Sequence, residues 1–313
     1  MLKALFHILI FPGFFFLFIF GLIAEFVDRK LYARLQNRVG PPWFQPLADF
    51  IKLASKEEII PTEADAAVFK LIPLLALTTT ISAMLYIPVW SSTAVFHFNG
   101  DIIVVLYLLT IPTLCYFLGG WYSRSVYSMI GAVRSLTQLF AYEVPLFLCI
   151  LAPALLADTW SISEMVAFYN KHLGYWFCNL LGFAVAIISL LGKLEKVPFD
   201  IPEAETEIVA GAFTEYGGKL LAFLRIALDI ELVVGASLLA AVFLPFGFNL
   251  KPGYFFIFYL LQVFCIIAFV SFLRTIFARL RLDQMINFCW KYLAPLALLQ
   301  VLVNLILKTI LPR

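Results

Sequence analysis

The sequence predicts an all-α integral membrane protein with about eight transmembrane helices and additional amphipathic surface helices. Composition, the length of the apolar segments and the placement of Lys and Arg support this prediction. Of 313 residues, 63% are hydrophobic and 13% are charged, about half the charged fraction of a soluble domain. The mean hydropathy is +0.97. A soluble core could not bury so much apolar surface, so the solvent must be lipid. The net charge of +2 is too small to indicate a nucleic acid partner.

A helix that crosses the hydrocarbon core needs about 20 largely apolar residues. The segments that meet this requirement are 4–26, 68–90, 101–122, 136–157, 176–194, 219–246, 253–273 and 291–311. Helices are expected because lipid offers no partners for exposed backbone groups. We expect residues 1–313 to form a single polytopic domain. The first segment lacks a basic flank and a cleavage site, so it is interpreted as a retained span.

The odd-numbered connections between these spans carry most of the 22 Lys and Arg residues. By the positive-inside rule, these connections face the cytoplasm and both termini lie outside. The predicted location is the cell (plasma) membrane.

Two connections are expected to contain surface helices. In WFQPLADFIKLASKEE, residues 43–58, apolar and polar side chains segregate at helical spacing, which is typical of a helix lying at a membrane surface or against a partner. In SISEMVAFYNKHLGYW, residues 161–176, Ser161 and Glu164 have the spacing of a capping box.

Cysteine and histidine residues give no metal-binding pattern. The five cysteines include no C-x-x-C pair, and the three histidines lie far apart in sequence. We therefore expect no metal site and no cofactor bound by this chain alone.

The most unusual stretch is KVPFDIPEAETEIVAGAFTEY, residues 196–216, in the fifth connection. It contains Asp200, Glu203, Glu205, Glu207 and Glu215. These acids could form an ordinary solvated loop. The apolar residues between them and Pro202 instead favour a helix that begins near Pro202, with Glu203 and Glu207 on one face. Partly buried carboxylates that lie close together titrate as a unit, so this cluster could take up and pass on protons.

Charged residues also fall within the predicted spans. Each costs roughly 2.5–3.5 kcal/mol at bilayer depth on insertion scales, so they require compensation. Arg225 and Asp229 have i, i+4 spacing and could form a pair, with Glu231 nearby. Glu143 has no cation within one turn and precedes Pro145, which is expected to disturb the helix. Glu143 could be a helix-end residue that reaches the interface, but we favour a role in a proton path.

Four sequence blocks then suggest a family. They are Asp28–Pro61, Val133–Val144, Val197–Gly218 and Leu273–Lys291. Together they resemble the NADH dehydrogenase subunit 1 family, the proximal membrane subunit of respiratory complex I, and its relatives in energy-converting membrane-bound hydrogenases. The PFDIPEAETE motif followed by TEY is the most specific feature.

The resemblance implies a non-catalytic hub between a peripheral redox module and antiporter-like membrane subunits. The implied ion path comprises Glu143, Asp200, Glu203, Glu205, Glu207 and Glu215, with Asp229 and Glu231 as candidates in the sixth span. The implied charge partners or docking residues are Arg34, Arg38, Arg134, Arg225, Arg274 and Arg279. For the arginines of the last connection, simple positive-inside anchoring is the alternative.

Two departures from the quinone-linked pattern favour a membrane-bound hydrogenase or a related ferredoxin-linked complex. The first connection is the short QNRVGPPWFQP, and Leu228 stands where relatives commonly carry a Glu. The expected partners are peripheral iron–sulfur and hydrogenase-like subunits on the cytoplasmic side, which would carry iron–sulfur clusters and a nickel–iron centre. The alternatives are a quinone-site subunit of an NADH:quinone oxidoreductase and a stand-alone cation-coupled transporter. A transporter would be expected to show internal repeats, and we find none. The transported ion and the electron acceptor stay open.

Overall fold

The computed structural model describes residues 2–247 and 251–310, and regular structure in these residues is helical, without strands. Eight helical segments in the described chain are long and apolar enough to cross a membrane, as predicted. Their main helices are α2 (Phe14–Leu35), α4 (Ala66–Met84), α5 (Asp101–Tyr122), α6 (Val126–Ala157), α8 (Leu180–Lys193), α10 (Gly218–Phe243), α11 (Pro252–Ile276) and α13 (Ala294–Ile310).

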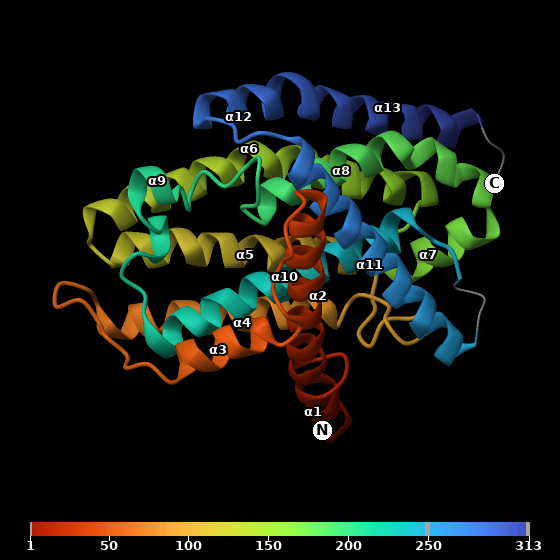
Figure 1. The fold of residues 1–313 in the computed structure, drawn as a ribbon. Coiled ribbons are helices and arrows are strands. Elements are labelled where there is room, and N and C mark those ends of the chain that lie inside the picture. The colour runs from red at the N-terminus through yellow and green to blue at the C-terminus, as the bar shows by residue number, and fades with distance from the viewer. Residues whose placement is uncertain (1, 248–250, 311–313) are drawn as a thin grey trace.

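These helices pack as a layered bundle. Figure 1 shows α13 above α6, with α5 and then α4 beneath, and the packing contacts follow the same order. Helix α2 runs across the direction of these helices and packs on α10 and α11. Within the most apolar stretch of α10, 89% of the residues are buried, compared with 28% in the last span. Glu231 of α10 is fully buried and therefore lies inside the protein and not against lipid.

Helix α6 is longer than the span predicted at 136–157. It begins after Ser125, which has extended backbone geometry, and it continues through Pro145 and Pro153. Pro145, which was expected to disturb the helix near Glu143, therefore does not end it. Prolines are tolerated in membrane helices because neighbouring groups can satisfy the freed carbonyls.

Both predicted surface helices are present, as α3 (Gln45–Ala54) and α7 (Ile162–Lys171). The predicted capping box of α7 is absent. The Ser161 hydroxyl instead donates to Asp101 at 3.2 Å, and the Asp101 carboxylate accepts the Ile162 N–H at 2.7 Å. A buried acid 60 residues away in sequence thus caps this helix in place of Glu164. The remaining short elements are α1 (Leu2–Leu9), η1 (Leu173–Asn179), α12 (Leu282–Phe288) and the π-helical turn η3 (Cys289–Leu293).

The stretch of residues 196–216, called the acid-rich segment below, does not form the helix predicted from Pro202. It contains only α9 (Glu205–Ile208) and η2 (Gly211–Phe213). Gly211 has φ +55°, and a Cβ there would lie 1.7 Å from the carbonyl oxygen of Pro202. The chain thus folds back tightly on itself, which only glycine permits. η2 also packs directly on α6, since a Cβ on Gly131 would lie 2.4 Å from the Ala212 nitrogen. These tertiary contacts override the local helix preference.

Candidate functional site

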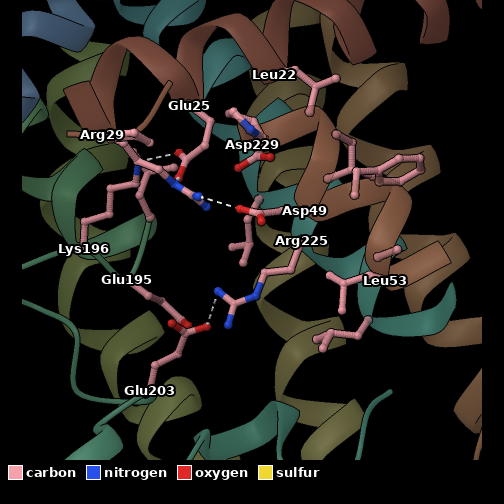
Figure 2. Close-up of a pocket in the computed structure, with 18 of the residues that line it drawn as sticks. Leu22, Glu25, Arg29, Asp49, Leu53, Glu195, Lys196, Glu203, Arg225 and Asp229 are labelled. Carbon is pink, nitrogen blue, oxygen red and sulfur yellow. Dashed lines mark hydrogen bonds and ion pairs between the residues drawn. The ribbon is translucent and has the colours of Figure 1, made fainter. Parts of the chain in front are cut away.

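A cavity of about 790 Å³ lies between α2, α3, α10 and the acid-rich segment. Figure 2 shows its side chains converging from these elements. Half of the residues that line it are acidic or basic: Glu25, Arg29, Asp49, Lys52, Lys56, Glu195, Lys196, Asp200, Glu203, Arg225, Asp229 and Arg274. Such a lining suits water and ions better than an apolar molecule.

One wall of the cavity is an ion-pair chain between α2 and α3. Arg29 lies 2.5 Å from Glu25 and 3.1 Å from Asp49. Gln45 donates to Asp49 at 2.8 Å. Asp229 of α10 lies beside Glu25 in Figure 2. Lys196 also lies 3.4 Å from Glu25, so this carboxylate contacts two cations.

The opposite wall joins α10 to the acid-rich segment. Arg225 lies 3.1 Å from Glu203, and the dashed line in Figure 2 marks this pair. Of the alternatives left open for Arg225, the structure shows a pair with Glu203 and not with Asp229. The segment folds over the end of α10 and brings the Glu203 carboxylate to Arg225.

Beneath the cavity, Asp28 forms the centre of a buried ionic cluster. Its side chain is fully buried and lies 2.5 Å from Lys196 and 2.6 Å from Arg274. The Ser271 hydroxyl also donates to Asp28 at 2.6 Å. Arg274 additionally stacks over the Tyr32 ring, with its guanidinium carbon 4.5 Å from the ring centroid. This cluster fixes the start of the acid-rich segment to α2 and α11.

Further arginines attach the segment at the surface. Arg279 lies 3.1 Å from the carboxylate of Asp200, and Arg134 lies 2.6 Å from that of Glu207. The hydrogen bond and charge of Arg134 lower the pKa of Glu207. Glu203 and Glu207 therefore contact different partners, and the prediction that they share one helical face was wrong.

The other predicted residues lie apart from these contacts. Arg34 and Arg38 are exposed at and beyond the end of α2, and Glu215 is half-buried between η2 and α10. The side chain of Glu205 lies outside the described part of the structure. Among the described residues, no three His, Cys, Asp or Glu side chains gather into a group that could hold a metal ion.

Glu195 lines the cavity and its side chain is buried. It is 7% exposed and accepts a hydrogen bond from Ser135 at 2.6 Å. Burial, with added repulsion from Glu203 and Glu231, raises the pKa of Glu195 to about 8 although the Ser135 bond opposes the shift. At neutral pH this side chain can therefore both bind and release a proton. Burial lowers the pKa of the neighbouring Lys196, but the negative charges of Asp28 and Glu25 raise it by more, so the pKa of Lys196 is raised overall.

Deeper still, Glu231 forms a buried ion pair with Lys193 at 2.7 Å, and the Tyr116 hydroxyl donates to Glu231 at 3.2 Å. Glu143 lies beyond Lys193, and both line a second, small cavity. The structure thus places ionisable groups in sequence from the charged cavity through Glu195 and Glu231 to Glu143.

Replacing Glu195 with Gln should remove one contribution to the pH dependence of stability. The pKa of Glu195 rises from 4.5 to about 8 on folding, so in that range the folded chain holds a proton that the unfolded chain has lost. This contribution is fully present below pH 4.5 and is lost as the pH rises to about 8. The unfolding temperature of the detergent-solubilised protein should therefore fall with pH less steeply in Glu195→Gln than in the wild type or in the exposed-site control Glu164→Gln. Equal slopes in all three would contradict the assignment.

Sequence reasoning missed Glu25, Asp28 and Glu195 as site residues and treated Lys193 and Lys196 only as topology markers. Glu25 carried the same signal as Glu143, an acid within an apolar span. Asp28 gave no such signal, because its partners lie on residues far away in sequence.

Comparisons with known proteins agree with this architecture. A family model described as NADH dehydrogenase matches residues 7–305. The chain is 32% identical over 302 residues to an NADH-quinone oxidoreductase subunit of Carboxydothermus hydrogenoformans, covering 92% of this chain and 85% of that protein. It is 33% identical over 305 residues to the corresponding protein of Bacillus cytotoxicus, covering 92% and 89% respectively.

A solved structure is also similar along nearly the whole chain. It is that of the membrane-bound sulfane sulfur reductase, an archaeal respiratory membrane complex, with a TM-score of 0.85 and 32% identity. The match covers 97% of this chain and 98% of that chain. The resemblance inferred from the four sequence blocks is confirmed: the chain belongs to the NADH dehydrogenase subunit 1 family and is a membrane subunit of the complex I-like type.

Proposed function

We propose that this subunit couples electron transfer in a peripheral redox arm to the movement of protons or sodium ions across the membrane. The observation that carries the proposal is the charged cavity of about 790 Å³ and its continuation through buried ionisable groups to Glu143. Buried charges are costly in a membrane protein and usually mark an ion or proton pathway.

The proposed route begins at the protein surface, where Asp200 and Glu207 of the acid-rich segment pair with surface arginines. This surface is called the rim below. It continues through the cavity acids Glu25, Glu203 and Asp229 to Glu195, and then to Glu231 and Glu143. A change in charge near the rim would alter the proton affinity of the cavity acids, because closely spaced carboxylates titrate together. In this way an electron transfer near the rim can drive proton movement without a cofactor in this chain.

The proposed partners follow from the exposed arginines and the surface of the acid-rich segment. A peripheral iron–sulfur arm of the hydrogenase or ferredoxin-linked type would dock there, with Arg34 and Arg38 among its contacts. Antiporter-like membrane subunits would lie beside the helices that carry Glu143. The excess of Lys and Arg supports a cytoplasmic position for the acid-rich segment and an outer position for both termini.

A quinone-binding role is the second candidate. The relatives named above are NADH-quinone oxidoreductase subunits, and the cavity is large enough for a small molecule. Its charged lining is the reason that we favour ion coupling. Quinone in a solvent extract of the purified complex would favour the second role.

Reconstitution of the complex into liposomes tests the proposal. We expect ion uptake only while electrons are supplied, measured with a pH-sensitive dye and with radioactive sodium. Electron transfer without ion movement would contradict coupling. Solute or ion uptake by the purified single chain would favour the stand-alone transporter instead.

A further inference from the structure

Lys193 occupies an unusual position for a cation in a membrane protein. It is the last residue of α8 and is only 2% exposed. Its ammonium lies 2.7 Å from Glu231 and donates a hydrogen bond to the carbonyl oxygen of Leu109. A lysine carries its charge on a flexible four-carbon stem, so the ammonium can move without a change in the backbone.

A second acid lies within the surroundings of the same ammonium. Lys193 and Glu143 both line a cavity of about 10 Å³ between α5, α6, α8 and α10, which is about the smallest volume that can hold one water molecule. Lys193 is the charged group that acts electrostatically on Glu143. Most of the remaining lining is aliphatic or aromatic, and the buried Lys193 ammonium is not shielded by bulk water.

The other groups around Glu231 do not supply a second cation. Tyr116 and Cys115 face it from α5, and Glu195 faces it from the segment after α8. Among the described residues, Lys193 is therefore the one cation paired with Glu231. One cation between two acids leaves an unbalanced negative charge when both acids are ionised. In an apolar setting this favours one proton shared between the two carboxylates.

We propose that Lys193 is a mobile cation that makes the protonation of Glu231 and Glu143 mutually exclusive, so that a proton arriving at one acid expels a proton from the other. The inference rests on the proposed ion-coupling function and names the residue that performs the deepest step of the path.

The step balances in protons and charge. A proton that arrives from the cavity by way of Glu195 forms an O–H bond on Glu231. The ammonium then lacks its counter-ion and moves towards Glu143. The O–H bond of Glu143 breaks, and its proton leaves on the far side. Lys193 keeps its three protons throughout, and no oxidant or reductant is needed.

A purely structural ion pair is the competing explanation, and a double variant separates the two. Removing one member of a buried pair leaves an uncompensated charge, so Lys193→Gln or Glu231→Gln alone should reduce the amount of assembled complex. The double variant Lys193→Gln/Glu231→Gln has no unbalanced charge and should assemble. We therefore expect it to restore assembly and electron transfer to a soluble dye acceptor, but to lower ion uptake per electron by about 100-fold, the low end of what a positioned proton-transfer group contributes.

The measurement uses the whole complex in liposomes, with a pH-sensitive dye for proton uptake. Lys219→Gln, an exposed lysine at the start of α10, is the matched control and should behave as the wild type. Wild-type ion uptake in the double variant would overturn the mobile-cation role. Failure of the double variant to assemble while both single variants assemble would overturn it too, because the pair would not then behave as a charge-compensated unit.

Glu143→Gln distinguishes a failure of this inference from a failure of the proposed function. If Glu143→Gln stops ion uptake but the double variant does not, the path exists without a mobile Lys193. If neither change affects ion uptake, the ion path itself is wrong.

Discussion

Replacing Glu143 with Gln should lower ion translocation by about 100-fold while leaving assembly and electron transfer close to wild type. Gln keeps the shape of the side chain but removes the group that binds and releases a proton. Glu143 is half-buried, and no hydrogen bond or ion pair to its side chain is found in the described residues. Its loss should therefore have little effect on stability. Ion uptake per electron in liposomes is the measurement.

The control for this variant is Glu164→Gln, which removes an exposed acid from α7. It should translocate ions as the wild type does. Unchanged translocation in Glu143→Gln would remove this residue from the path. Loss of assembly in that variant would show that Glu143 has a structural role instead.

Replacing Asp28 with Ala should destabilise the protein by about 3–5 kcal/mol, the cost of removing one partner from a buried ion pair. Lys196 and Arg274 would then lie close together without their shared counter-ion. The start of the acid-rich segment should detach from α2 and α11. We expect a strong loss of assembled complex and a lower unfolding temperature in detergent.

Asp283→Ala is a suitable comparison, because Asp283 is exposed in α12. Its effect should stay within about 0.5 kcal/mol. Adding Lys196→Met to Asp28→Ala should recover part of the lost stability, since it removes the repulsion between Lys196 and Arg274 that Asp28 no longer compensates. Wild-type stability of Asp28→Ala would show that the cluster does not hold the segment.

The sequence was sufficient to predict the helices because their signals are local. Long apolar runs predicted the spans, and the helical spacing of Phe50 and Ile51 against Asp49 and Lys52 predicted α3. Intramembrane acids predicted Glu143 and Asp229 as candidate site residues, because their cost in lipid can be judged without knowing their neighbours.

Pairings could not be predicted in the same way. Arg225 had a candidate partner four residues away in Asp229, yet it lies against Glu203 because the acid-rich segment folds back over α10. That fold depends on the close approach of Gly211 to Pro202 and of Gly131 to η2. The Asp28 cluster depends on Ser271 and Arg274, which are more than 240 residues away in sequence. Neither arrangement leaves a pattern in the local sequence.

The central claim is that carboxylates along this path change protonation when electrons pass nearby. Infrared difference spectroscopy on the complex, recorded on adding the electron donor, tests this directly in the stretching region of protonated carboxyl groups. We expect difference bands that are absent in Glu143→Gln and in the Lys193→Gln/Glu231→Gln variant but present in Glu164→Gln. Identical spectra in the wild type and in the path variants would contradict the account.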